Sequence, residues 1–150
     1  MRKNIKLRVK NLVNKYQTAD PFALAKELDV NILYVPLPEK IRGILVRVLR
    51  KKTILLNDKL NYEAQKIVIC HELGHVRMHW HAGYFFQHEG IYYFPARYEC
   101  EANEFAIHLL NYSSDFIYDK DYILEVLAKE NPNPYEVHKI INALMQIENI

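Results

Sequence analysis

The sequence predicts a mostly helical α+β domain with a small β-sheet, in which one helix carries an HExxH motif. Apolar residues recur with helical spacing in the first thirty residues and again from residue 61, and short runs of Ile, Leu and Val lie between these stretches. The chain has 150 residues, of which 50% are apolar, a size typical of one domain with its own core. We expect a single domain over 1–150, with an N-terminal helical part (1–30), a small sheet (31–57), helices and an aromatic loop (61–110) and C-terminal helices (113–150).

Two helices are predicted before the sheet. The first follows from the spacing of Ile5, Val9, Leu12 and Tyr16, and the second begins with Asp20 as N-cap and Pro21 at the first helical position. The first fifteen residues also carry six Lys or Arg and no acidic residue, although the net charge of the chain is only +2. We interpret this basic stretch as a solvated helix face rather than a binding surface.

Three strands are predicted from the sequences ILYV (32–35), GILVRVL (43–49) and TILLN (53–57). The basic residues 50–52 are expected to form the turn between the last two. The strand at 43–49 is a candidate edge strand, along which an extended peptide could lie by β-augmentation.

Helical spacing returns from Asn61 or Tyr62 to about Trp80. A loop rich in Tyr and Phe (82–95) is expected next, either as a substrate-binding lid or as an extra layer of core. A helix over 97–110 follows, and two more are predicted at 121–129 and 134–147, separated by the breaker sequence NPNP.

His71-Glu72-Leu73-Gly74-His75 is the HExxH motif, and it falls inside the predicted helix that begins near residue 61. The two histidines are one helical turn apart, so both project from one face toward a single ion. Catalytic zinc sites have three protein ligands and leave a position for water, and the glutamate of the motif is then the general base. Residues 61–110 are therefore expected to hold a zinc site with Glu72 as its catalytic base.

The third ligand has several candidates. His79 is about 12 Å along the helix from His71, too far to share its ion. His81 has the spacing of the metzincin pattern, but Met78 occupies the position where that pattern has a glycine. Glu99 is the favoured candidate, with Asn103 one turn later able to reach the outer nitrogen of a ligand histidine. Glu101 remains the alternative carboxylate; its other interpretation is a solvated surface charge.

The sequence contains neither a signal-peptide pattern nor an apolar run of membrane-spanning length, so we expect no membrane association and a cytoplasmic location. The two cysteines, Cys70 and Cys100, are too few for a disulfide framework and fit a reducing compartment. Both are expected to be buried as small apolar residues.

HELGH at 71–75 and ECEANEFA at 99–106, in this order and preceded by TILLND, resemble the ImmA/IrrE metallopeptidase family over roughly 24–110. The resemblance implies one Zn²⁺ per chain held by His71, His75 and Glu99, with Asn103 supporting the site. It also implies an anti-repressor protease of mobile elements that cleaves a helix-turn-helix repressor. The chain reads Leu-Leu-Asn-Tyr at 109–112, where family members often have LLMP, so the end of that helix differs from the family pattern.

Such a protease needs a donor for the oxyanion, and candidates for this role or for substrate contact are Tyr92, Tyr93, Tyr98 and His88. The expected partner is a protein substrate, and direct nucleic-acid binding is not expected. A second function class remains open, because PFALAKELDVNI (21–32) is similar to the first half of many helix-turn-helix modules. In that case the protein is a DNA- or protein-binding regulator with a non-catalytic zinc site.

Overall fold

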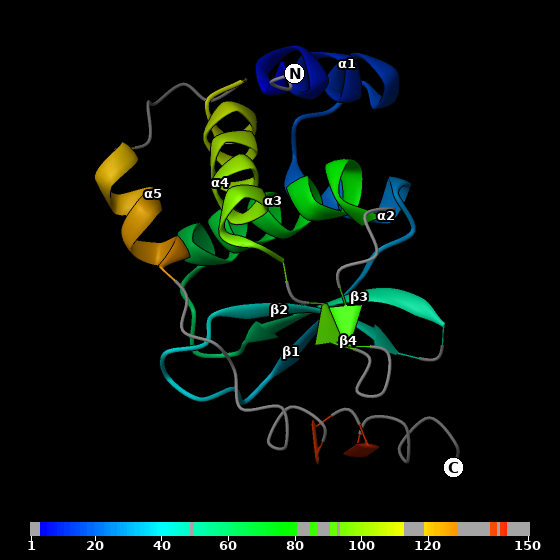
Figure 1. Cartoon of the computed structure of the whole chain (residues 1–150), viewed down its shortest axis with the longest axis vertical. Helices are drawn as coiled ribbons and strands as arrows, with labels where there is room; N and C mark the ends of the chain where they lie inside the picture. Colours follow the sequence, from blue (N-terminus) through cyan, green and yellow to red (C-terminus); the bar gives the residue numbers. More distant parts are fainter. Residues whose placement is uncertain are drawn as a thin grey trace.

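Helices lie above one face of a mixed β-sheet in the computed structural model (Figure 1), which describes residues 4–48, 50–80, 85–86, 91–92, 94–112, 119–128, 139–140 and 142–143. The helices of these residues are α1 (Ile5–Tyr16), α2 (Pro21–Glu27), α3 (Tyr62–Met78), α4 (Ala96–Leu110) and α5 (Lys120–Leu127). The strands are β1 (Asn31–Val35), β2 (Gly43–Val48), β3 (Lys51–Asn57), β4 (Phe85–Phe86) and β5 (Ile91–Tyr92). The predicted α+β class, with a small sheet and HExxH on a helix, is confirmed.

The sheet has the strand order β1-β3-β2-β5-β4, with β1 parallel to β3 and the other pairs antiparallel. The three predicted strands are present. Two strands of two residues each, β4 and β5, lie in the segment predicted to be a loop. Because Val46 of β2 pairs with Ile91 of β5, β2 has neighbours on both sides and the prediction of an edge strand there is wrong.

The turn between β2 and β3 is shorter than predicted. Val48 pairs with Lys51, so Lys51 and Lys52 belong to β3 rather than to the turn. Arg50 has a φ of 67°, in the left-handed region. Positive φ values of this kind are typical of two-residue hairpin connections, which have the twist that the flanking strands need.

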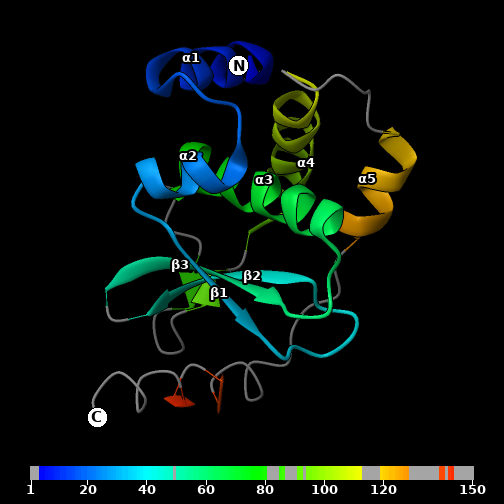
Figure 2. The same cartoon turned by 180° about the vertical axis from the view of Figure 1, so that it is seen from behind.

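Helix α3 is the centre of the fold, between the sheet and the outer helices (Figures 1 and 2). Leu45, Ile54 and Leu56 of the sheet belong to the same buried cluster as Ile67 and Leu73 of α3. The opposite sheet face has its own smaller cluster, against which Ile140 packs. Since both faces of α3 are covered, its residues 67–76 are all buried.

Local signals place the helix starts where the sequence predicts them. The Asp20 side chain accepts a hydrogen bond from the Ala23 backbone at 3.1 Å, and Pro21 is the first residue of α2. Asn61 caps α3 in the same way, accepting from the Ala64 backbone at 2.8 Å. Such caps satisfy backbone donors that have no partner within the helix.

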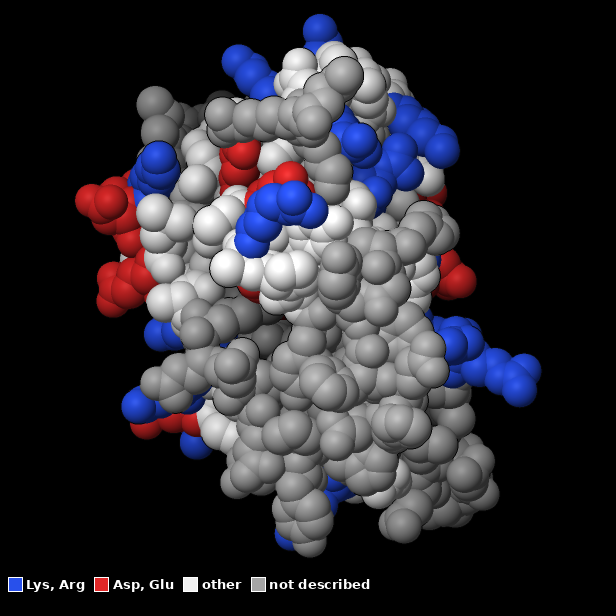
Figure 3. All heavy atoms as spheres, in the orientation of Figure 1, with Lys and Arg blue, Asp and Glu red and all other residues white. Residues whose placement is uncertain are grey.

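The basic side of α1 faces solvent, as expected. Lys6, Arg8, Lys10 and Lys15 are exposed, whereas Ile5, Val9, Leu12 and Val13 are buried. Figure 3 shows Lys and Arg gathered over the end of the molecule where α1 lies.

Helices α4 and α5 end close to their predicted limits. Helix α5 ends at Leu127 rather than at residue 129, and residues 139–140 and 142–143 of the last predicted helix are helical. The rest of that helix lies outside the described residues. Among the described helices, none combines the length and apolar character that a membrane crossing requires.

Helices α3 and α4 approach closely at Gly74. A Cβ atom built there would lie 3.1 Å from both Cβ and Cγ of Phe105, a fully buried residue of α4. Ala102 and Ala106, two small residues of α4 near Phe105 in sequence, are also fully buried. A glycine in a helix interior lowers stability by about 1 kcal/mol relative to alanine. Here the glycine permits close contact between α3 and α4.

We predict that Gly74→Val lowers the free energy of unfolding of the metal-free protein by about 1–3 kcal/mol, because the added side chain overpacks against Phe105. Urea unfolding in the presence of a chelator measures this loss. Phe105→Leu combined with Gly74→Val should recover part of it in a double-mutant cycle. Wild-type stability of Gly74→Val alone would show that the two helices are not packed so closely.

Candidate active site

Three side chains from two helices converge beside the core. His71 and His75 lie one turn apart on α3 and are fully buried, and Glu99 comes from the first turn of α4. The Glu99 carboxylate reaches both rings, with Oε2 3.0 Å from Nε2 of His71 and Oε1 2.9 Å from Nε2 of His75. The close approach of α3 and α4 at Gly74 therefore has a chemical consequence, because it brings a carboxylate to the two histidines.

The donor set of this group fits a metal ion. One ligand atom from each of His71, His75 and Glu99 lies within 4.8 Å of the others. Two imidazoles and one carboxylate are the ligands of many catalytic zinc sites. Both histidines direct the same ring nitrogen, Nε2, toward the shared carboxylate, so their lone pairs can serve one ion.

Glu72 lies on α3 and Asn103 lies on α4, the two helices that carry the candidate site. Glu72 follows His71 directly on α3 and is fully buried. The predicted contact of Asn103 with the outer nitrogen of a ligand histidine is not seen among the described residues. Within them, Oδ1 of Asn103 and Nδ1 of His71 are both buried without a hydrogen-bond partner, and Nδ1 of His75 faces His79. Support of the site by Asn103 therefore stays a prediction.

The structure corrects the alternative interpretation of Glu101. This carboxylate is not a solvated surface charge, because its Oε1 lies 2.7 Å from Nε2 of His79 and its side chain is only 19% exposed. His79, 1% exposed, also contacts His75, with 2.9 Å between their Nδ1 atoms. Neither residue belongs to the group of described residues that could hold a metal ion. His81, the remaining candidate ligand, lies outside them.

Aromatic rings cover the histidines on the side of α4. Phe94 stacks on His75 with ring centroids 3.8 Å apart, and Tyr98 stacks on His79 at 4.2 Å. Of the four predicted oxyanion or substrate contacts, only Tyr98 has a described side chain. Tyr92 is described as part of β5 only, and Tyr93 and His88 lie outside the described residues.

Sequence reasoning missed the contacts of Phe94, His79 and Glu101. One signal was available for His79, which continues the spacing of His71 and His75 by one more turn. The partner of each of these residues lies on another element, and periodicity within one element carries no information about such contacts.

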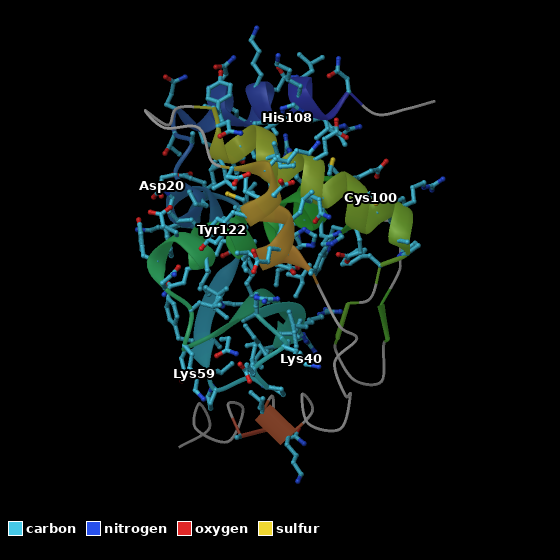
Figure 4. All side chains as sticks on the ribbon, turned by 90° about the vertical axis from the view of Figure 1, so that its left-hand side faces the viewer. Asp20, Lys40, Lys59, Cys100, His108 and Tyr122 are labelled. Atoms are coloured by element: carbon cyan, nitrogen blue, oxygen red, sulfur yellow. The ribbon has the colours of Figure 1, made fainter. Side chains whose placement is uncertain are left out.

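The two cysteines differ from each other. Cys70 is buried beside His71, and burial raises the pKa of its thiol far above the usual range. Cys100 is exposed on α4, contrary to the expectation that both are buried (Figure 4). Neither forms a disulfide.

A buried HExxH helix that meets a carboxylate from a following helix defines the class of metallopeptidase-like domains with a His-His-Glu site. Within this class, residues 25–139 match the Peptidase_M78 family, described as the IrrE N-terminal-like domain, and the chain belongs to that family. The resemblance to ImmA/IrrE proteins is thereby confirmed.

A relative from Bacillus phage phi105 carries the name "Uncharacterized immunity region protein 2". It is 37% identical over 106 residues, which cover 71% of this chain and 67% of the relative. No solved structure matches the chain with statistical significance.

The geometry predicts that the purified protein binds about one divalent metal ion per chain and that Glu99→Ala and His71→Ala abolish this stoichiometric binding. Elemental analysis after dialysis against Zn²⁺ measures it. His108→Ala is the matched control, because His108 lies on α4 toward the end remote from Glu99 (Figure 4) and pairs with Glu104. Metal retention by Glu99→Ala would exclude this carboxylate as a ligand.

Proposed function

We propose that the protein is a zinc-dependent endopeptidase that cleaves a helix-turn-helix repressor, acting in the cytoplasm as an anti-repressor of a mobile element. The observation that carries the proposal is the set of three convergent ligand residues with a fully buried glutamate next to one of them. A structural zinc site usually closes with four protein ligands, whereas a catalytic site keeps one position open. Three ligands among the described residues therefore favour catalysis.

His71, His75 and Glu99 would hold the zinc ion in this reaction. When bound, zinc acts as a Lewis acid on the scissile carbonyl and makes water nucleophilic near neutral pH. Glu72 takes a proton from the water as its oxygen adds to the scissile carbonyl carbon. It then passes this proton to the amide nitrogen, so that the C–N bond breaks and the amine leaves. Burial of Glu72 suits this role, because a base excluded from bulk water keeps the proton within the site.

The substrate class rests on two supports. The phage phi105 relative is named for an immunity region, and lysogenic immunity depends on repressors. The ImmA/IrrE resemblance independently implies cleavage of such a repressor. The oxyanion donor is proposed among Tyr92, Tyr93, Tyr98 and His88, with Asn103 supporting the ligands.

Cleavage is tested by co-expressing the protein with helix-turn-helix repressors of phage immunity regions and following each repressor by gel electrophoresis and mass spectrometry. Wild type is expected to produce two defined fragments. Glu72→Gln should slow cleavage by about 10²–10⁴-fold, because it removes general-base catalysis. Glu104→Gln, which changes a carboxylate on α4 that pairs with His108, should cleave like wild type.

The metal content of Glu72→Gln distinguishes loss of the base from loss of the site, and we expect it to equal that of wild type. Cleavage by Glu72→Gln at the wild-type rate would exclude Glu72 as the base. An intact repressor with metal-loaded wild type would exclude this substrate.

The competing function, a regulator that binds DNA through the basic face of α1, makes a different prediction. Binding of that kind would shift duplex DNA in a gel and weaken steeply with salt, since the exposed lysines and arginine would displace counterions. We expect no such shift at physiological salt. A salt-dependent shift lost when Lys6 and Lys10 are replaced by Gln would favour the regulator.

A further inference from the structure

A line of hydrogen-bonding groups runs from α4 to the proposed metal site through two histidines, His79 at the C-cap of α3 and His75 within that helix. Oε1 of Glu101 lies 2.7 Å from Nε2 of His79, and Nδ1 of His79 lies 2.9 Å from Nδ1 of His75. The second ring nitrogen of His75 then faces Glu99 at 2.9 Å. Both ring nitrogens of His79 and both of His75 thus lie at hydrogen-bonding distance from a partner.

The positions of the protons follow from the partners. A carboxylate only accepts hydrogen bonds, so Nε2 of His79 must carry a hydrogen and donate it to Glu101. In a neutral imidazole the other nitrogen, Nδ1 of His79, then has a lone pair and accepts from Nδ1–H of His75. Nε2 of His75 faces the Glu99 carboxylate and by the same argument carries a hydrogen until a metal ion takes that place. When an ion does so, His75 keeps its Nδ1–H toward His79, and the lone pair of its Nε2 serves the ion.

We infer that His79 and Glu101 are positioning residues that hold His75 in the tautomer and orientation required of a metal ligand, an inference that rests on the proposed metal site. Ligand histidines usually donate their outer N–H directly to a carboxylate or a carbonyl. Here a second imidazole stands between the ligand and the carboxylate.

Packing fixes the two rings of this relay, defined as Glu101, His79 and His75. Phe94 stacks on His75 with an interplanar angle of 6°, and Tyr98 stacks on His79 with an angle of 7°. Both imidazoles are nearly fully buried, so water does not compete for their nitrogens. The ring planes and the hydrogen bonds therefore support the same orientation.

The other histidine of the group lacks an equivalent support. Nδ1 of His71 is buried and has no hydrogen-bond partner in the part of the chain that the structure describes. The relay is therefore specific to one ligand. Glu101 and His79 do not act as ligands themselves, because the nitrogens of His79 are engaged by His75 and Glu101, and neither belongs to the metal-binding group.

The test measures Zn²⁺ affinity of the purified full chain by competition with a chromophoric chelator. His79→Phe preserves a ring for Tyr98 to stack on but removes both nitrogens, and Glu101→Ala removes the acceptor. Each should weaken zinc binding by about 10–100-fold. Glu101→Gln keeps an acceptor oxygen without the charge and should lose less than Glu101→Ala. Glu104→Gln on the same helix is the control and should bind zinc like wild type.

A second readout, long-range ¹H–¹⁵N NMR of the zinc-loaded wild type, reports the tautomers without any substitution. We expect the hydrogen on Nε2 of His79 and on Nδ1 of His75. Zinc affinities of folded His79→Phe and Glu101→Ala within twofold of wild type would overturn the relay, as would a hydrogen on Nδ1 of His79 with none on Nε2. If His79→Phe fails to fold, the wild-type tautomers and the Glu101 variants decide.

These outcomes separate the relay from the proposed function. Failure of wild type to bind zinc overturns the metal site and the relay with it. Normal zinc binding by all the variants overturns the relay alone, and the peptidase proposal stands.

Discussion

The arrangement of the site depends on how closely α3 and α4 can pack. A side chain at position 74 would press on Phe105, whose ring is completely buried between the helices. Because position 74 is glycine, the first turn of α4 comes near enough for the Glu99 carboxylate to lie within 3.0 Å of both histidine rings. A residue with no side chain of its own thus allows the close packing in which the three candidate ligands meet.

Burial of the polar residues in this part of the fold is energetically unfavourable, and a functional site explains why they are present. His71, Glu72, His75 and His79 are all at most 1% exposed on the central helix of the fold. Transferring such groups from water is unfavourable unless they find partners. The three histidines lie within hydrogen-bonding distance of two carboxylates of α4. Apolar side chains of the same size would pack here without needing polar partners. Conflict between burial and polarity of this kind is typical of functional sites.

Much of the fold follows from local signals in the sequence. Asp20-Pro21 and Asn61 are capping residues that act within one turn of chain, so they place α2 and α3 directly. The three longer strands follow from runs of β-branched and leucine residues. Strands β4 and β5 could not be predicted, because two residues are too few to show alternation and their pairing with β2 is a long-range contact.

The candidate site could likewise be predicted only in part from the sequence. The spacing of His71 and His75 is a property of one helix and could be read from the chain. The choice between Glu99 and Glu101 depends on the rotation of α4 about its axis relative to α3, which no residue pattern specifies. Both carboxylates turn out to face histidines, since Glu99 reaches the first two of the series and Glu101 reaches the third.

The proposed ligands and the proposed relay are consequently two parts of one helix contact. His71 and His75 lie one turn apart on α3, and His79 is the C-cap residue of the same helix. Helix α4 presents two carboxylates to these histidines from its first turns. A small sliding of α4 along α3 would move Glu99 and Glu101 together, so the ligand set and the support of His75 would be disturbed at once. Interfaces packed this densely shift between discrete arrangements rather than deforming gradually. The packing that buries Phe105 therefore also places both carboxylates.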